Sequence, residues 1–296
     1  MAHKSKSSRW WRHHVGYPLE ATFLSVIYGI FKALPLDAAS ALGGWIGRTV
    51  GPHLRRSHTV RRNLARALPE LTQNHREEIL LGMWDNLGRV VAEYPHLNEV
   101  WHRTEVIGAE TVHSLATSKT PALFFSAHIG NWEINLMGAT RNGLPVTAVY
   151  RRPNNPAVSR LVDSARSVIG SRLVPKGRDG AKEVVSTLRN RGAVCMLIDQ
   201  KMNDGIAVPF FGRNAMTAPA IAQLAYRYRC AVVPAVVERL GGTRFRLTIS
   251  PPLELRETGD QDADVRALMV RINALVEEWV RAHPEQWLWL HRRWPD

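Results

Sequence analysis

Apolar residues recur at intervals of three and four along the first hundred residues of the chain. The pattern is clear in LEATFLSVIYGIF, AASALGGWIG and REEILLGMWDNLGRVVAEY, and strand-like alternation is nearly absent from this part. Because this spacing places apolar side chains on one face of a helix, we expect residues 1–104 to form an N-terminal helical region.

From Glu105 the pattern changes to short β-rich runs that alternate with helical segments. The runs PALFFSA, PVTAVY, RLVP, AVCMLI and CAVVPAVV are typical of strands, and helical patterns cover residues 131–141, 156–167, 181–191 and 218–228. Continuous apolar strands between helices predict an α/β domain over residues 105–296, with a mixed, mostly parallel sheet flanked by helices. Ligands of such sheets bind at the carboxyl ends of the strands.

The apolar stretch of residues 17–36 follows a basic N-terminus and is interrupted by Glu20 and Lys32. It resembles a secretory signal, but no convincing small-residue cleavage pattern follows. Its uninterrupted part would span only about 17 Å as a helix, short of the roughly 30 Å of a bilayer core. Trp10 and Trp11 are typical of membrane interfaces. We therefore expect a membrane-docking helix, and the alternative is a buried core helix.

The charge of the chain indicates an anionic partner. Lysine and arginine total 39 against 26 acidic residues, a formal charge of +13. Residues 48–66 contain six arginines and no acidic residue. An anionic membrane surface fits this cluster better than an ordinary solvated face does, although charge alone leaves nucleic acid, phospholipid and phosphorylated glycolipid open.

Metal and disulfide chemistry are not indicated. Cys195 and Cys230 lie singly in apolar runs, which predicts buried thiols rather than a disulfide or a CxxC site. The chain has no HExxH motif and no third ligand at a recognisable spacing, so we expect neither a metal nor another cofactor.

Polar clusters follow three of the predicted strands. His128 and Glu133 come after PALFFSA, Arg151 and Arg152 after PVTAVY, and Asp199 with Gln200 after AVCMLI. Histidine can act as a general base near neutral pH, and a carboxylate can orient it. Glu133 is the expected partner of His128, provided that the histidine precedes the helix in a turn. Ser126 lacks a GxSxG elbow and is interpreted as structural.

These blocks together resemble a known family. SAHIGNWEI is similar to the HX4(D/E) signature of the glycerolipid and lysophospholipid acyltransferase superfamily, and in particular of the lipid A late acyltransferases, the lauroyl and myristoyl enzymes. VYRRPNNP, LIDQ, VPFFGRNAMTAPA, AVVPAVV and PEQWLWLHRRW resemble further blocks of that family, so that the similarity covers nearly the whole chain. Many superfamily members carry an EGTR-like block where this sequence has Asp199 and Gln200, so that the chain departs from the family pattern at this position.

The resemblance implies acyl transfer from a thioester, acyl-carrier protein or acyl-CoA, to a lipid A precursor at the cytoplasmic face of the cell inner membrane. It implies His128 and Glu133 as the catalytic pair. Arg151, Arg152 and Arg213 are expected to contact anionic groups of the substrate. The alternative for Arg151 is a salt bridge to Asp199.

Asp199 and Gln200 are assigned to substrate binding. Two alternatives remain open: an acyltransferase for a phospholipid, ornithine lipid or mannolipid, and a basic nucleic-acid-binding protein. The latter lacks any recognised nucleic-acid-binding signature, so we expect no nucleic-acid partner.

Overall fold

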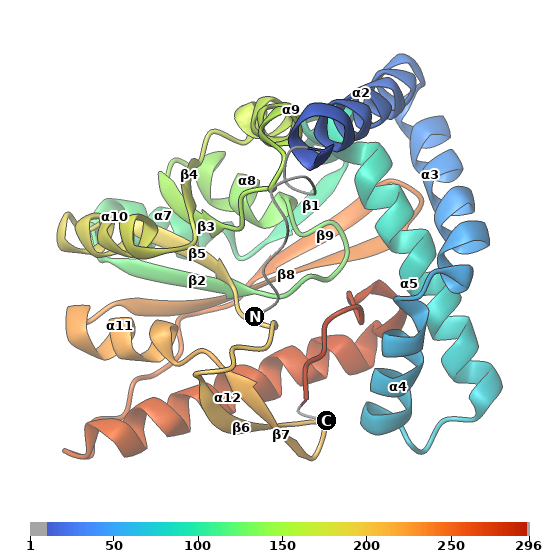
Figure 1. Ribbon diagram of the computed structural model, residues 1–296. Coiled ribbons are helices and arrows are strands. Elements are labelled where there is room, and N and C mark those ends of the chain that lie inside the picture. The colour runs from blue at the N-terminus through green and yellow to red at the C-terminus, as the bar shows by residue number, and fades with distance from the viewer. Residues whose placement is uncertain (1–10, 295–296) are drawn as a thin grey trace.

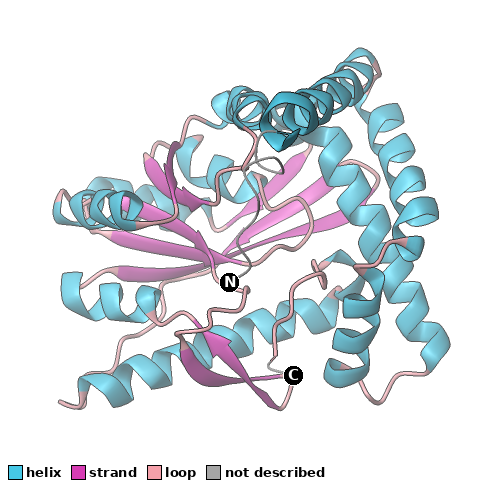
Figure 2. Cartoon of the chain, in the orientation of Figure 1, coloured by secondary structure: helices cyan, strands magenta, loops and turns pink. Residues whose placement is uncertain are grey.

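The computed structural model describes residues 11–294 of the chain. A seven-stranded sheet with the order β1-β9-β8-β2-β5-β3-β4 forms its centre, and helices cover both faces (Figures 1 and 2). All neighbouring strands are parallel except β8 and β9, which are antiparallel. The predicted mixed, mostly parallel sheet flanked by helices is therefore confirmed.

The strands are β1 (Thr104–Ile107), β2 (Ala122–Ser126), β3 (Val146–Tyr150), β4 (Arg172–Pro175), β5 (Ala193–Leu197), β6 (Ile206–Phe210), β7 (Arg213–Thr217), β8 (Ala231–Gly241) and β9 (Arg244–Ile249). The α-helices are α2 (Tyr17–Ala33), α3 (Leu36–Val50), α4 (Ser57–Ala67), α5 (Gln73–Glu93), α6 (Leu97–His102), α7 (Ala109–Ser118), α8 (Ile134–Thr140), α9 (Pro156–Arg166), α10 (Arg178–Arg189), α11 (Ala220–Tyr228) and α12 (Gln261–Ala282). β6 and β7 form a separate hairpin.

Strand β2 shows why the sheet is covered on both faces. All five of its residues are buried. Leu123 and Phe125 belong to a hydrophobic cluster with residues of α4, α5, α11 and α12, whereas Ala122 and Phe124 belong to a second cluster with residues of α7 and α8. Because successive side chains of a strand point to opposite faces, a continuous apolar run needs a helical layer on each side.

The N-terminal helices are packed closely beside the sheet. α3 and α5 approach each other where Gly43 meets Gly88, and a Cβ atom at either glycine would overlap the backbone of the other. Leu64 of α4 and Leu80 of α5 are fully buried in the same cluster as Phe125. The helices before β1 thus share a hydrophobic core with the sheet.

Helix α2 is the exception, because Phe31 is its only residue classed as buried. It lies against α9 at the top of the view in Figure 1. None of the helices in residues 11–294 is both long and apolar enough to cross a membrane. Of the aromatic residues expected at a membrane interface, Trp10 lies outside the described residues and Trp11 is 63% exposed.

Candidate active site

The register of the sheet brings His128 and Asp199 together. β2 and β5 are parallel neighbours with Ser126 opposite Leu197, and the two site residues each come two positions later. Nδ1 of His128 lies 2.8 Å from Oδ1 of Asp199, and the backbone N–H of His128 donates to Oδ2 at 2.9 Å. The carboxylate therefore fixes both the ring and the main chain of the histidine.

The electrostatics of the pair favour an ionised Asp199 and a proton on the histidine. Burial by itself opposes the charged carboxylate, but the charge and hydrogen bonds of His128 and the indole N–H of Trp287 hold the pKa of Asp199 well below its usual range. Burial likewise opposes a charged His128, and the charge and hydrogen bond of Asp199 outweigh it and raise the histidine pKa. The side chain of Asp199 is only 2% exposed, so solvent screens the pair weakly.

Gln200 lies between two histidines. Its Nε2 atom is 3.4 Å from Nε2 of His128 and 3.0 Å from Nε2 of His291. An amide nitrogen carries two N–H groups and can donate to both rings when both Nε2 atoms are unprotonated. With its Nδ1 proton donated to Asp199, His128 then has its lone pair on Nε2, which is the atom of a base available to a substrate.

Glu133 has other partners than the expected one. Its carboxylate accepts from the Arg166 guanidinium, with Nε of Arg166 2.8 Å from Oε2, and from the Tyr94 hydroxyl at 2.6 Å. The expected hydrogen bond between His128 and Glu133 is replaced by the one to Asp199, because the strand register places Asp199 at Nδ1. Glu133 still acts on the histidine through its charge, which raises the pKa of His128.

The loop that carries His128 rests on a buried ion pair. Glu93 is fully buried and accepts from Arg239 at 2.6 Å and from the side chain of Asn131 at 2.9 Å. Gly130 has a φ of +58°, and a Cβ atom there would lie 2.5 Å from the carbonyl oxygen of Val237. Only glycine fits this turn without strain. The turn is thus fixed by the hydrogen bond of Asn131 to the buried Glu93 and by the close approach of Gly130 to β8.

Residues 283–294, which we call the C-terminal strap, form one side of the site. The indole of Trp287 donates to Oδ2 of Asp199 at 2.8 Å, and the N–H of Leu288 donates to the carbonyl of His128 at 3.0 Å. Further along, the buried guanidinium of Arg293 donates to the hydroxyl of Thr217 at 2.8 Å. Burial lowers the pKa of Arg293 to about 10.

The arginines expected to bind substrate lie on different elements. Arg151 and Arg152 are exposed after β3, which neighbours β5, so they follow the same edge of the sheet as Asp199. Arg152 donates to the Tyr150 hydroxyl at 3.3 Å. Among the described residues no ion pair joins Arg151 to Asp199. Arg213 begins β7 and donates to the carbonyl of Arg66 on α4.

The predicted buried thiols are confirmed, since Cys195 and Cys230 are 6% and 2% exposed. Burial raises the pKa of each thiol to about 12. Both therefore stay protonated and unreactive near neutral pH. Ser126 is buried at the end of β2.

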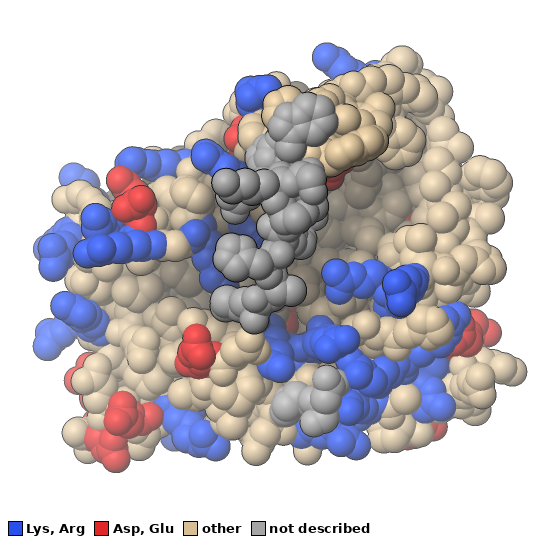
Figure 3. Space-filling view, viewed as in Figure 1, with Lys and Arg blue, Asp and Glu red and all other residues tan. Residues whose placement is uncertain are grey.

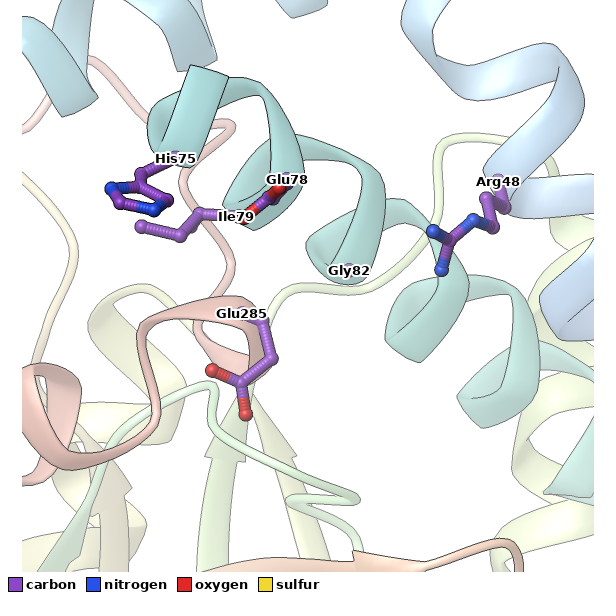
Figure 4. A pocket seen from close by; sticks show the side chains of 6 residues that line it. All are labelled: Arg48, His75, Glu78, Ile79, Gly82 and Glu285. Atoms are coloured by element: carbon purple, nitrogen blue, oxygen red, sulfur yellow. The ribbon is translucent and has the colours of Figure 1, made fainter. Parts of the chain in front are cut away.

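A surface depression of about 430 Å³ lies elsewhere (Figure 4). It is lined by Arg48, His75, Glu78, Ile79, Gly82 and Glu285. The depression shares only Glu285 with the C-terminal strap and none of the residues that contact His128 or Asp199, and we assign no role in acyl transfer to it.

Known proteins of one family match this chain over most of its length. The sequence profile of the bacterial lipid A biosynthesis acyltransferase family matches residues 9–296. The lipid A biosynthesis lauroyltransferase of Escherichia coli is 26% identical over 293 residues, 95% of this chain and 92% of that protein. The myristoyltransferase of the same organism is 26% identical over 257 residues, 84% and 77% respectively. A lipid A biosynthesis acyltransferase of Haemophilus influenzae is 25% identical over 262 residues, 84% and 78%. The chain therefore belongs to the bacterial lipid A biosynthesis acyltransferase family and is an acyltransferase.

Proposed function

We propose that this protein transfers a fatty acyl group from an acyl thioester, carried by acyl-carrier protein, to a hydroxyl of a lipid A precursor, and that His128 is the general base. The observation that carries the proposal is the His128–Asp199 pair, in which Nε2 of His128 is free of the carboxylate and lies 3.4 Å from the side-chain nitrogen of Gln200. The family match supports lipid A biosynthesis as the setting.

The reaction follows from this geometry. Nε2 of His128 takes the proton of the acceptor hydroxyl as its oxygen attacks the thioester carbonyl, and Asp199 stabilises the imidazolium that forms. The tetrahedral intermediate collapses by breaking the carbon–sulfur bond. The departing thiolate then takes the proton from His128, leaves as a thiol and restores the neutral base to the histidine. No covalent acyl-enzyme is needed, which agrees with two thiols that burial keeps protonated.

Anionic groups of the substrates need cationic partners near this edge of the sheet. Arg151 and Arg152 are exposed there, and guanidinium groups bind phosphate bidentately. We assign to them the phosphate of the donor's pantetheine arm or of the lipid A precursor. Arg213 stands in the hairpin beside α4, where lysine and arginine side chains gather near the C-terminus (Figure 3), and would serve the same class of group.

Helix α2 supplies a membrane-docking surface in this proposal. Leu19, Phe23, Val26 and Ile30 are each at least half exposed and recur at intervals of four, three and four, which places them on one face of the helix. Such an exposed apolar face suits insertion into the headgroup region of a bilayer. Exposed arginines of the 48–66 segment would add attraction to anionic lipid at the cytoplasmic face of the inner membrane.

The proposal is tested with purified protein and labelled acyl-carrier protein or acyl-CoA as donors. Lipid A precursor, phospholipid and ornithine lipid serve as acceptors. We expect label on the lipid A precursor, with acyl-carrier protein the preferred donor, and a loss of about a hundredfold to ten-thousandfold in His128→Ala. The exposed His113 on α7 offers the control His113→Ala, which should retain full activity. With donor alone, the intact mass should stay unchanged. Near wild-type turnover in His128→Ala, or label on phospholipid instead, would refute the proposal.

A further inference from the structure

The C-terminal strap contacts both members of the His128–Asp199 pair. The N–H of Leu288 donates a hydrogen bond to the carbonyl of His128, and the indole N–H of Trp287 donates one to the carboxylate of Asp199. The strap itself is held from α4, where the side-chain amide of Asn63 donates to the carbonyl of Trp289 at 2.8 Å and to that of His291 at 2.6 Å. Its position relative to the pair is thus fixed by hydrogen bonds at several points.

The two oxygens of Asp199 have separate tasks. Oδ2 accepts from the indole of Trp287 at 2.8 Å and from the backbone N–H of His128 at 2.9 Å. Oδ1 accepts from the imidazole of His128. Two donors on one oxygen fix the rotation of the carboxylate, so the other oxygen stays in line with Nδ1.

We propose that Trp287 is a positioning residue of the transfer reaction, whose indole N–H holds the Asp199 carboxylate against His128. The inference deepens the proposed function, because it assumes that His128 is the base. Trp287 does not touch substrate in this proposal. It acts through Asp199. A hydrogen bond to an ionised carboxylate is stronger than one between neutral groups, so the indole N–H can fix the orientation of Asp199.

Trp289 provides a matched comparison within the same strap. Its ring lies 4.5 Å from that of Trp287, edge to face, and both residues are at most 2% exposed. The indole N–H of Trp289, however, donates to the carbonyl of Pro284 at 2.7 Å and not to the site. Replacing either tryptophan by phenylalanine removes similar packing, but only the change at 287 removes a donor from Asp199.

The direction of the effect follows from the charges around His128. Burial opposes its protonated form, and the charge and hydrogen bond of Asp199 favour it most. Without the indole N–H, Oδ2 keeps only the backbone N–H of His128, and the carboxylate is free to turn so that Oδ1 moves away from Nδ1. The pKa of His128 should therefore fall in Trp287→Phe.

The test measures His128 directly in the full-length protein. Exchange of the imidazole C2 hydrogen for deuterium, followed by mass spectrometry of the peptide that contains His128, gives the pKa of this histidine without any acyl transfer. We expect a fall of about half a unit or more in Trp287→Phe and no change in Trp289→Phe. An unchanged or raised pKa in Trp287→Phe would overturn the proposal. If that variant does not fold, benzothienylalanine at position 287, which replaces the N–H by sulfur at nearly constant shape, takes its place.

Activity provides the second readout. The acidic limb of the kcat/KM profile should move to lower pH in Trp287→Phe by the same amount as the pKa, and should not move in Trp289→Phe. Because the exchange measurement needs no substrate, the two hypotheses separate. A shifted pKa with no transferase activity in wild-type protein would refute the proposed function but would still show that Trp287 holds Asp199 against His128. An unchanged pKa of His128 in Trp287→Phe, together with an active wild-type enzyme, would refute the role of Trp287 and leave the proposed function intact.

Discussion

Replacing Asp199 by asparagine should remove the base while preserving the shape of the site. The remaining carbonyl oxygen can still accept from Trp287 and from the backbone of His128. The new amide NH2 group then faces Nδ1, which must accept a hydrogen bond and shifts the ring proton to Nε2. A base with its proton on the reacting atom is inactive. We expect kcat/KM to fall by about a hundredfold to ten-thousandfold, or roughly 3–5 kcal/mol of transition-state stabilisation.

The pH dependence gives this prediction a sign. In the wild type the Asp199 charge raises the pKa of His128 against the effect of burial. In the variant burial is unopposed by that charge, so the histidine pKa falls and the acidic limb of any residual activity moves to lower pH. The contribution of Asp199 to folding stability depends on pH in a more acidic range. Asp199 has a depressed pKa, so its contribution is present above its unfolded pKa of about 3.9 and is lost as pH falls through the folded value. Asp199→Asn has no carboxylate to protonate at this position, so its stability should not show that loss at acidic pH.

The assay is steady-state transfer between pH 5 and 9, with unfolding followed by circular dichroism in parallel. Asp179, whose side chain is 93% exposed, provides the control Asp179→Asn, which should match the wild type in both measurements. A folded Asp199→Asn enzyme within threefold of wild-type kcat/KM would show that the carboxylate does not prepare the base, and the reasoning from the His128–Asp199 geometry would fail.

Two further predictions concern stability and membrane binding. Glu133→Gln should lower the free energy of unfolding by about 3–5 kcal/mol, since it leaves the largely buried guanidinium of Arg166 without its charge partner; chemical denaturation measures this, and an unchanged midpoint would contradict it. Glutamate at both Phe23 and Ile30 should weaken binding to anionic vesicles at high salt without affecting the fold, whereas Ser25→Glu, on another face of the same helix, should not. Equal vesicle binding by both variants in a sedimentation assay would rule out a role for this face.

The predicted strands and helices of residues 105–296 are recovered because each carries a continuous apolar run or a clear helical period. β1 and β9 are not among the predicted strands, since TEVI and RFRLTI are short and mix charges with apolar residues. The β6–β7 hairpin turns at Phe211 and Gly212, both of which have positive φ, and the glycine is the turn signal that the sequence itself carries. The division of the chain at residue 104 stays a prediction, although helices before it and strands after it share one core.

The residues of the candidate site follow from the rule on strand ends, but their pairing does not. Glu133 lies five residues from His128 and Asp199 seventy-one, so proximity in sequence favours Glu133, whereas Asp199 is the residue hydrogen-bonded to Nδ1. Choosing Asp199 requires knowing that β2 borders β5 with Ser126 opposite Leu197. Arg166, Trp287 and their contacts depend on tertiary packing that no local pattern encodes. The basic charge, which left a nucleic-acid-binding protein open, is now found on a member of an acyltransferase family.

The strand order has a consequence for how the protein folds. β2, which carries His128 at its end, borders β8 on one side, with Ala122 opposite Ala231. The partners are thus separated by most of the catalytic region, and closing so long a loop costs entropy before any pairing is gained. Until β8 joins, the fully apolar β2 presents an unpaired edge. We expect slow folding with a collapsed, aggregation-prone intermediate, and a strong dependence of soluble yield on chaperones and on expression temperature.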